Sequence, residues 1–433
     1  MKVLFISEYF PPKIMGGGEI NVNLLAKALV KNKVEVSLLT SYHPGLNRVE
    51  IVDGIKVYRT LKTAADPHSV INNLKRSIDL PKSIVKEVNK IVKKHEFDAI
   101  HFIGASIIAA PKLKKLNVPL FATIESFPAL CPKGDRFYHG KKECSYNCSF
   151  FKYIFCQMNS TEIGKVRNKF YLKYNLVSLA YVYCYYRQLN RSLHYCNLIA
   201  ISEYVKKILF RQSLDSKVIP NALDTKKYSL TKRQKNNNAD DNDDKNKNNN
   251  ANTKTRVKNN PNKINLLYLG SLTKFKGPQI LLKALIGLNC HADFYGEGPL
   301  KEEMLIKIKK HNLDAQIHNP VPYSKIPEIY ANADIVVFPS AWPEPFGRIA
   351  IESMAAGKPV IGSDIGAIKE LITKGAGILI GSGNVNELRT AIKKLIQNPK
   401  LREKMGKIGI KAAQGYDEEN TMRKIKTFYF SKQ

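Results

Sequence analysis

The chain has 433 residues, of which 44% are hydrophobic and 24% charged, values typical of a globular protein of two or three domains. Its 69 Lys and Arg against 37 acidic residues give a formal charge of +32, which favours anionic partners, although a general preference for Lys and Asn would produce the same excess. The apolar run at the N-terminus is too short for the h-region of a secretory signal, and the most apolar later run, residues 176–186, is too short to span a bilayer. We therefore expect a cytoplasmic protein whose seven cysteines are reduced.

Short apolar runs alternate with amphipathic runs in the first half of the chain. The apolar runs predict strands at residues 2–7, 34–40, 98–104, 118–126, 197–202 and 217–221. The amphipathic runs predict helices at residues 21–32, 83–97 and 202–212. This alternation is typical of a parallel sheet covered by helices.

Residues 230–263 interrupt the pattern with a segment dominated by Asn, Asp and Lys. Such a composition buries too little apolar surface to offset the entropy lost on ordering. We predict a disordered insert near a domain boundary, and a tether to an anionic surface is the functional alternative.

The alternation restarts after the insert. It predicts strands at residues 264–271, 292–298, 334–340 and 359–363, helices at residues 278–288 and 349–358, and a last helix at residues 416–430. The sequence therefore predicts an α/β protein with two doubly wound domains in series.

A glycine run that includes Gly17 and Gly18 opens a helix after the first strand. Glycines let a backbone approach a ligand, and a helix N-terminus favours an anion. The dinucleotide pattern G-x-G-x-x-G is absent here, and a flexible turn is the alternative interpretation.

A second loop follows the strand that ends at Gly270 and carries Lys274 and Lys276 before Gly277. Loops at the carboxyl edge of a parallel sheet face the ligand crevice. A lysine there can hold a diphosphate as a point charge, and two solvated lysines are the alternative.

Two glutamates, Glu344 and Glu352, flank the start of a helix that follows the buried strand at residues 334–340. The helix is expected to begin near Phe346 or Gly347, so the amides of Phe346, Gly347 and Arg348 can meet a phosphate. The Glu352 carboxylate can accept two hydrogen bonds from ribose hydroxyls, and Glu344 can do the same for a sugar. Surface acids at a helix start are the alternative.

The order of these motifs resembles the family 4 glycosyltransferases. The resemblance rests on GGGE, ISEYVKK, VIPNALD, YLGSLTKFKG, YGEGPL and the long segment around EPFGRIAIE, and it covers nearly the whole chain outside the insert. It implies a glycosyltransferase-B fold of two Rossmann-like domains facing across a cleft. The expected parts are an acceptor-side domain at residues 1–222, a nucleotide-sugar domain at 264–412, and a helix at 413–433 that returns to the first domain.

The resemblance also implies roles for individual residues. Glu352 would hold the donor ribose, Glu344 the donor sugar and Lys276 the phosphate, while Gly17 and Gly18 would close over the diphosphate. Such enzymes usually retain the anomeric configuration and need no metal and no cofactor besides the donor, here a UDP- or GDP-sugar. The full set of donor-binding candidates is Gly17, Gly18, Ser271, Lys274, Lys276, Glu344, Phe346, Gly347, Arg348 and Glu352.

Two positions depart from the family pattern. Ser271 stands where the family often has an arginine on the diphosphate, and Lys274 is a candidate replacement. Glu125 stands where many relatives have a histidine near the donor sugar and acceptor. It is a candidate acceptor-side base, with Glu344 and Lys276 as the other catalytic candidates, while a degenerate site is the alternative. Glu19 and His101 complete the acceptor-side candidates.

Four cysteines fall close together at Cys131, Cys144, Cys148 and Cys156. Four thiolates can bind structural zinc, but the spacing is not the compact C-x2-C pairing of zinc sites. Reduced free thiols are the favoured interpretation.

Residues 165–193 combine tyrosines with lysines and arginines, a mixture that suits a membrane interface or a lipid-linked acceptor. A packed helix with a basic outer face is the alternative. No RNA-binding motif with interleaved aromatic residues is present, so we expect no nucleic-acid partner.

The sequence thus predicts a retaining glycosyltransferase of the hexosyltransferase type, independent of metals. It would transfer a sugar to a glycan, lipid-linked or small acceptor during polysaccharide or glycolipid synthesis. We expect it in the cytoplasm, with an anionic membrane surface as a possible peripheral site. A catalytically weak binding or scaffold subunit on the same fold is the alternative.

Overall fold

The structure is a computed structural model that describes residues 1–13, 17–63, 70–138, 142–144, 147–158, 176–229, 231, 263–372 and 375–432. Most of the insert expected at residues 230–263 lies outside the described residues. The chain divides into two compact units, which we call unit 1 (residues 1–222 and 418–433) and unit 2 (residues 223–417). The assignment of an acceptor to the first unit and of a nucleotide sugar to the second stays a prediction.

Unit 1 is built around an eight-stranded sheet in the order β10-β9-β6-β5-β1-β2-β4-β3. Its strands are β1 (Lys2–Ser7), β2 (Glu35–Ser41), β3 (Val49–Val52), β4 (Ile55–Leu61), β5 (Ala99–Ile103), β6 (Leu120–Ile124), β9 (Asn197–Ala200) and β10 (Ser216–Val218). The strands pair in parallel except β3, which pairs antiparallel with β4. Strands such as β5 and β6 are buried along their whole length, as expected for a parallel sheet covered on both faces.

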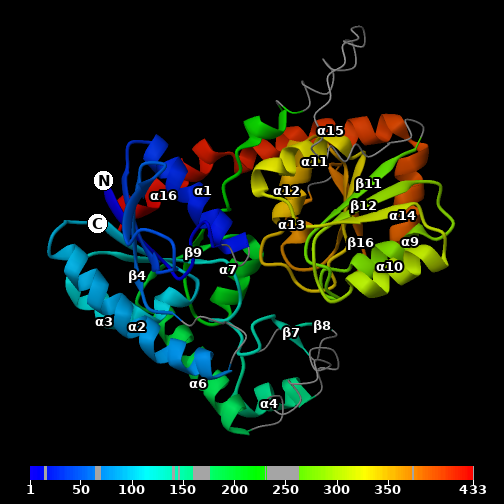
Figure 1. The fold of residues 1–433 in the computed structure, drawn as a ribbon. Coiled ribbons are helices and arrows are strands. Elements are labelled where there is room, and N and C mark those ends of the chain that lie inside the picture. The colour runs from blue at the N-terminus through cyan, green and yellow to red at the C-terminus, as the bar shows by residue number, and fades with distance from the viewer. Residues whose placement is uncertain are drawn as a thin grey trace. The chain divides into compact units, whose positions relative to one another are not determined.

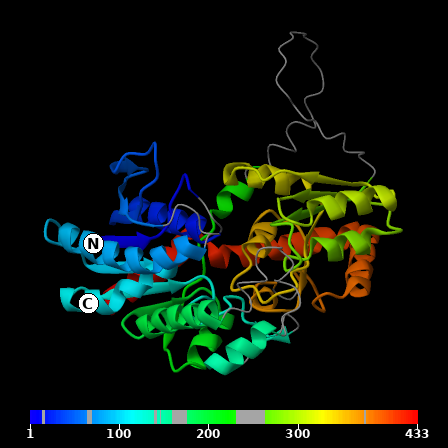
Figure 2. The same ribbon diagram turned by 60° about the horizontal axis from the view of Figure 1, so that its bottom comes forward.

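The helices of unit 1 include two that pack against each other after a short hairpin. The helices are α1 (Gly17–Lys31), α2 (Val70–Val92), α3 (Ala110–Leu113), α4 (Phe150–Met158), α6 (Leu176–Leu193), α7 (Glu203–Phe210) and α16 (Glu418–Phe430). A short hairpin, β7 (Phe137–Tyr138) and β8 (Lys142–Glu143), precedes α4. Helix α4 lies against the first part of α6, as Figure 2 shows in cyan and green.

Unit 2 has a six-stranded, wholly parallel sheet in the order β13-β12-β11-β14-β15-β16. Its strands are β11 (Asn265–Leu269), β12 (His291–Tyr295), β13 (Ala315–His318), β14 (Ile335–Phe338), β15 (Val360–Ser363) and β16 (Gly377–Ile380). Its helices are α9 (Pro278–Leu285), α10 (Lys301–Lys310), α11 (Ile326–Asn332), α12 (Arg348–Ala355), α13 (Ile368–Leu371), α14 (Val385–Gln397) and α15 (Pro399–Ala413). Figure 1 shows α9, α10 and α14 on one face of this sheet and α11, α12 and α13 on the other.

Both sheets are doubly wound, because the chain starts in the middle and adds strands first on one side and then on the other. In unit 2 the direction reverses between β11 and β14, and in unit 1 between β1 and β5. Ligands of open α/β sheets bind at the carboxyl ends of the strands where the order reverses. Each unit therefore has one edge at which a ligand site is expected.

Most predicted elements appear close to their expected positions, and the hairpin of β3 and β4 is one that the alternation did not predict. Its turn is Asp53–Gly54, with φ of 52° at Asp53 and 79° at Gly54. This dipeptide is the preferred sequence of a two-residue hairpin turn, because both of its residues accept a positive φ. The hairpin adds an antiparallel edge to the sheet of unit 1.

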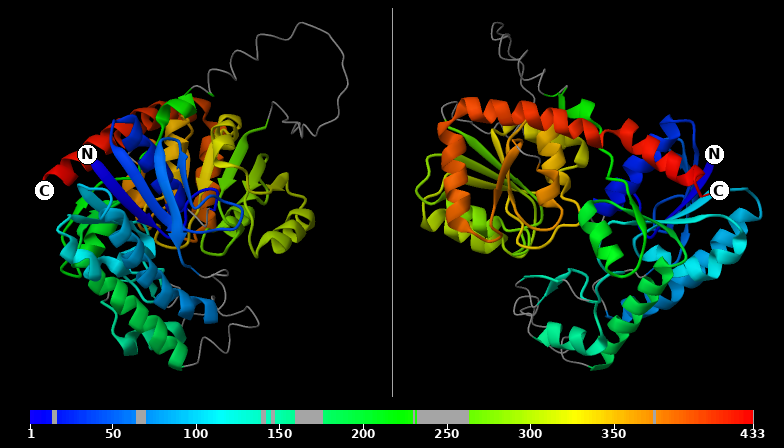
Figure 3. Two further views of the ribbon diagram at one scale, coloured as in Figure 1. Left: turned by 60° about the vertical axis from the view of Figure 1, so that its left-hand side comes forward. Right: turned by 180° about the vertical axis from the view of Figure 1, so that it is seen from behind.

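The C-terminal helix α16 packs into the core of unit 1, beside α1 (Figure 3). Met422, Ile425 and Tyr429 of α16 belong to the same apolar cluster as the strand residues Val3 and Phe5. The Tyr429 hydroxyl lies 2.5 Å from Nδ1 of His101, a wholly buried residue of β5. Thr123 contacts the other ring nitrogen, Nε2, at 2.8 Å. This contact fixes the last helix to the centre of the sheet.

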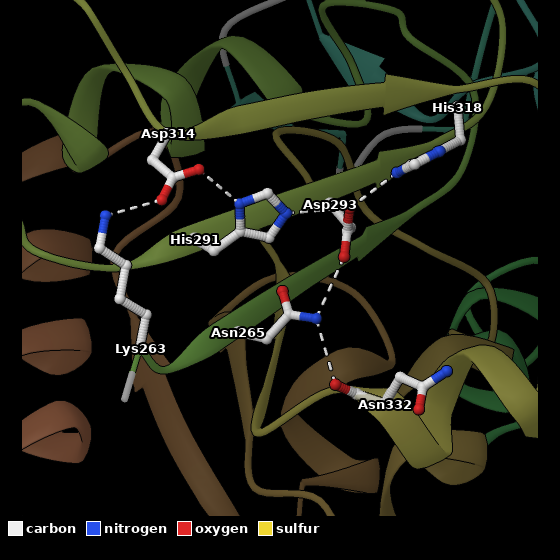
Figure 4. A network of polar contacts seen from close by, with 7 residues as sticks. All are labelled: Lys263, Asn265, His291, Asp293, Asp314, His318 and Asn332. Carbon is white, nitrogen blue, oxygen red and sulfur yellow. Dashed lines mark hydrogen bonds and ion pairs between the residues drawn. The ribbon is translucent and has the colours of Figure 1, made fainter. Parts of the chain in front are cut away.

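A polar network crosses β11, β12 and β13 in unit 2 (Figure 4). Oδ1 of Asp293 lies 3.2 Å from Nε2 of His291 and 2.7 Å from Nε2 of His318. Hydrogen bonds to Asp293 and Asp314 raise the pKa of His291 to about 9. Burial raises the pKa of Asp293, but hydrogen bonds from the two histidines outweigh it and hold that pKa well below its usual range. His291 is therefore a cation at neutral pH.

The contact between His101 and Tyr429 can be tested by Tyr429→Phe. This change removes the hydroxyl and leaves a buried ring nitrogen without its partner, so the free energy of unfolding of unit 1 should fall by about 1–3 kcal/mol. Hydrogen exchange of peptides from β5 and β6 would measure it. Phe430→Leu is the control, because Phe430 is 58% exposed, and an equal loss in both variants would contradict the prediction.

His101 and His291 predict opposite pH limits for the two units. Burial lowers the pKa of His101 to about 3, so unit 1 should lose stability as pH falls below about 6.5, where the unfolded histidine takes a proton. His291, with a pKa raised to about 9, stabilises unit 2 fully below pH 6.5, and this contribution should disappear as pH rises through 9.

Urea unfolding at several pH values would measure both limits. Fluorescence of Trp342, the only tryptophan, reports unit 2, and hydrogen exchange reports unit 1. His291→Gln should flatten the alkaline limit of unit 2 and leave the acid limit of unit 1 unchanged. An unaltered alkaline limit in that variant would show that other groups cause it.

Candidate functional site

Two predicted residues meet where the sheet of unit 2 reverses its strand order. Lys276 lies in the loop after β11, and Glu344 lies in the loop after β14, the neighbouring strand. Nζ of Lys276 lies 2.7 Å from Oε1 of Glu344. The candidate site in unit 2 is therefore formed by the carboxyl ends of two adjacent parallel strands.

Glu344 is 5% exposed, and its burial is compensated by several donors. Besides Lys276, the Ser340 hydroxyl donates to Oε1 at 3.0 Å and the Trp342 indole nitrogen donates to it at 2.9 Å. The ammonium group of Lys276 also lies 5.1 Å from the centre of the Trp342 ring. A buried carboxylate with this set of donors is fixed in orientation.

Two glycines allow the backbone to form this arrangement. Gly277, with φ of 75°, precedes α9, and a Cβ atom there would lie 1.9 Å from the carbonyl oxygen of Pro339. Gly366, with φ of 61°, lies against the backbone of Glu344, where a Cβ atom would be 2.5 Å from its nitrogen. Any side chain at either position would push the two loops apart.

Glu352 lies in the second turn of α12 and is 3% exposed. The Tyr323 hydroxyl donates to Oε1 at 2.7 Å, and the Tyr330 hydroxyl donates to Oε2 at 3.1 Å. Arg348, one turn earlier, lies 3.7 Å from Oε1 and donates to Tyr323 at 3.0 Å. The Glu352 carboxylate is thus held by two tyrosine hydroxyls and lies beside the Arg348 guanidinium.

Burial raises the pKa of the Glu352 carboxyl, and Arg348 and the tyrosine hydroxyls oppose this rise. Burial also raises the pKa of Tyr323 and Tyr330, with the charge of Glu352 adding to it. Both tyrosines therefore stay protonated and act as donors. They hold Glu352 in one orientation.

The start of α12 agrees closely with the expectation. The helix runs from Arg348, with Gly347 as its N-cap in the left-handed region at φ of 95°. Phe346 is buried. The two remaining donor-binding candidates of unit 2, Ser271 and Lys274, are both exposed.

The unit 1 candidates include one pair in proximity. Gly17 and Gly18 open α1, and Glu19 follows in its first turn. Glu125 directly follows β6 and is half-buried. A Cβ atom at Gly18 would lie 2.8 Å from Oε2 of Glu125, so the glycine run and Glu125 are neighbours.

His101 does not fit the acceptor-side role expected from its position. It lies in the middle of β5, not at the strand end, and it is wholly buried. Both ring nitrogens contact hydroxyls, those of Tyr429 and Thr123. His101 is a core residue, and we leave it out of the proposed site.

The four clustered cysteines line one cavity in unit 1, together with Arg136 and Tyr153. All seven cysteines of the chain lie among the described residues, and none of them forms a disulfide. Burial, with the neighbouring thiols, raises the pKa of Cys148 to about 12, so this thiol is protonated. In the part of the chain that the structure describes, no three His, Cys, Asp or Glu side chains are placed to hold a metal ion. The interpretation of the four cysteines as reduced free thiols stays a prediction.

The sequence analysis missed the side chains that surround the two glutamates. Ser340 and Trp342 lie within four residues of Glu344. A polar or aromatic residue in a loop is only a weak sequence signal of a contact with the carboxylate. Tyr323 and Tyr330 lie far from Glu352 in sequence, in and before α11. Only folding brings them together.

Two family models match most of the chain. "Glycosyltransferase Family 4" matches residues 15–227, and "Glycosyl transferases group 1" matches residues 249–412. The first match lies within unit 1 apart from its last residues, and the second lies in unit 2.

Individual relatives agree with these matches. The uncharacterized glycosyltransferase MJ1607 of Methanocaldococcus jannaschii is 24% identical over 419 residues, which cover 93% of this chain and 91% of that protein. The glycosyltransferase MJ1178 of the same organism is 27% identical over 165 residues, 38% of this chain, and the match spans only 47% of that protein's length.

Among solved structures, HepE of Anabaena in complex with UDP and glucose is similar at a TM-score of 0.67 and 19% identity. The similarity covers 100% of both chains and shows the fold. Together with the two family models, it establishes that the chain belongs to the family 4 glycosyltransferases and has the glycosyltransferase-B fold.

Proposed function

We propose that the protein is a retaining, metal-independent hexosyltransferase that uses a nucleotide-sugar donor. The observation that carries this proposal is the contact of Lys276 with the buried Glu344 at the reversal point of the unit 2 sheet. A cation for a diphosphate and a fixed carboxylate for a sugar lie side by side there.

In the proposed donor complex, Glu344 accepts hydrogen bonds from hydroxyls of the transferred sugar and Glu352 accepts them from the ribose. Lys276, Lys274 and the amides at the start of α12 meet the diphosphate, with Gly17 and Gly18 as the covering loop. HepE was solved with UDP and glucose, and this supports a UDP-sugar, with a GDP-sugar as the other candidate.

The chemical step proposed here breaks the bond between the anomeric carbon and the phosphate oxygen. The acceptor hydroxyl forms the new bond on the same face, and its proton passes to Glu125 as the acceptor-side base, with Glu19 as a further contact to the acceptor. Negative charge develops on the leaving diphosphate, where Lys276 and helix amides stabilise it. These groups supply positive charge without a metal ion.

The acceptor is proposed to be a glycan, lipid-linked or small molecule in polysaccharide or glycolipid synthesis. A catalytically weak scaffold subunit is the competing hypothesis, supported by Ser271 and Glu125 at positions where the family differs. The buried arrangement of Glu344, Lys276 and Glu352 favours the enzyme, because it has no evident structural purpose that apolar residues would not serve better.

A cytoplasmic enzyme in peripheral contact with an anionic membrane is part of this proposal. No helix among the described residues is long and apolar enough to cross a bilayer. On unit 1, however, Phe151 of α4 is 81% exposed, and Met158 and Leu176 are also exposed. Arg187 and Arg191 are exposed further along α6. Apolar and basic side chains on adjacent helices suit the interface of an anionic bilayer.

Donor binding would test the two glutamates separately. With EDTA present, Glu352→Gln should weaken both UDP and the UDP-sugar about tenfold, because the ribose is common to both ligands. Glu344→Gln should weaken the UDP-sugar by a similar factor and change the affinity for UDP much less, because its proposed contact with the sugar is direct and its effect on the diphosphate passes through Lys276. Calorimetric titration of a panel of UDP-, GDP- and ADP-sugars measures both effects.

Glu303→Gln is the matched control, since this glutamate of unit 2 pairs with Lys307 on the surface of α10. Absence of binding by any nucleotide sugar to folded wild-type protein would favour the scaffold hypothesis. Binding that appears only after Mg²⁺ is added would contradict metal independence.

Membrane contact predicts that Phe151→Ser reduces co-sedimentation with vesicles of phosphatidylglycerol several-fold, because one large apolar side chain no longer enters the interface. Phe210→Ser is the control, because Phe210 is 78% exposed on α7 of the same unit. Equal binding of the wild type and the Phe151 variant would remove α4 from the proposal.

A further inference from the structure

Four side chains near the carboxyl edge of the unit 1 sheet have no role in the proposed donor site. Tyr9 and Lys13 lie in the segment after β1, His43 lies after β2, and Arg59 lies near the end of β4. These strands are neighbours in the order β1-β2-β4. We call the four residues the basic cluster.

The members of the basic cluster are close to one another. The ring of His43 stacks on that of Tyr9 with 6.2 Å between centres. The ammonium group of Lys13 lies 5.4 Å from the centre of the Tyr9 ring. Arg59 donates to the carbonyl oxygen of Pro11 at 2.9 Å, which ties β4 to the same loop.

Three polar atoms of the basic cluster are buried and have no hydrogen-bond partner among the residues that the structure describes: the Tyr9 hydroxyl, Nε2 of His43 and Nη1 of Arg59. Arg59 is 1% exposed and Tyr9 is 7% exposed. Nearly all buried polar groups in native proteins are hydrogen-bonded, and an unpaired guanidinium nitrogen is especially costly. Three such atoms in one contiguous group indicate a partner that binds there.

The charges around the basic cluster favour an anionic ligand. Arg59 is paired with Glu50, at 2.8 Å, and Glu8 is paired with Arg76. Among the charged residues named here, the three cations Lys13, Arg59 and Arg76 outnumber the two carboxylates Glu8 and Glu50 by one. Burial, Lys13 and Arg59 lower the pKa of His43, so its ring is neutral at neutral pH and available as a hydrogen-bonding group.

We propose that the basic cluster binds an oxyanion of the acceptor, a carboxylate or a phosphate, through Tyr9, Lys13, His43 and Arg59. This inference rests on the proposed transferase function and adds to it that the acceptor is anionic. A neutral sugar or a water molecule would satisfy the three unpaired atoms but would leave the excess positive charge uncompensated. Lys13 and His43 are half-buried, and they give access from solvent.

The carboxylate and the phosphate come from different acceptors, and binding of simple probes would separate them. The probes are inorganic phosphate, methyl β-D-glucuronide and the neutral methyl β-D-glucoside, titrated into the full-length protein with ligand-observed NMR. Saturating UDP is present, so that phosphate does not report the donor site. UDP binding is measured on the same preparation and tests the proposed function independently.

The expected result is that one of the anionic probes binds and that Lys13→Met and His43→Phe each weaken it about tenfold, the loss of one charge-assisted or buried hydrogen bond. UDP affinity should be unchanged in both variants. Lys56→Met is the matched control, because Lys56 lies 5.5 Å from the ring of Tyr58 on β4 and resembles the Lys13 contact. This control should bind the probe as the wild type does.

The pattern across the probes identifies the source of the anion. Binding of glucuronide alone indicates an acidic sugar, and binding of phosphate alone indicates a phosphorylated acceptor. The proposal is overturned when neither anion binds, when the glucoside binds as tightly as the glucuronide while phosphate does not bind, or when the Lys13 and His43 variants bind the anion like the wild type. Loss of UDP binding in the wild type would instead count against the transferase function.

Discussion

The contact of Lys276 with Glu344 joins two loops that the sheet of unit 2 brings to one edge. The Glu344 side chain is 7% exposed and the Lys276 side chain is 29% exposed, so solvent and salt screen this pair only in part. The cost of burying Glu344 is offset by Ser340 and Trp342, which donate to the same oxygen as the lysine. Removing any one of the three would weaken the orientation of the carboxylate. The geometry of the proposed donor site therefore depends on this contact.

The same contact has a consequence for ligand binding. Lys276 is held by Glu344 in the described structure, and a bound diphosphate would draw the ammonium group toward its own oxygens. The lysine can bridge the two anions, because an ammonium group has three donors. Phosphate and sugar binding would then be coupled through one side chain.

The cost of burying the Glu352 carboxylate is offset by a different set of groups. Two tyrosines and an arginine surround it, and each comes from a different turn of the unit 2 helices and loops. The tyrosine hydroxyls remain protonated because burial beside a carboxylate raises their pKa. Such a preorganised acceptor costs little reorganisation when a ribose binds. In unit 1, by contrast, the ring nitrogens of the buried His101 contact hydroxyls of the core, and one of these contacts holds α16.

Local patterns in the sequence determined the secondary structure, the two doubly wound sheets and the positions of the helix that starts at Arg348 and of the loop of Lys276. These depend on hydrophobic periodicity and on glycines within a few residues of each other, which are properties that the sequence contains directly. The resemblance to the glycosyltransferases likewise rests on short contiguous motifs. The β3–β4 hairpin was missed, although Asp53–Gly54 is a local signal for it.

Contacts between distant segments were decided only by the tertiary structure. His101 lies within the apolar run of β5, and its contact with Tyr429, 328 residues later, has no signal in the local sequence. The four clustered cysteines line one common cavity, which spacing alone did not decide. The partners of Glu352 and the members of the basic cluster come from separate strands and helices. Their proximity depends on strand order and side-chain packing, and neither is encoded in the local spacing of residues.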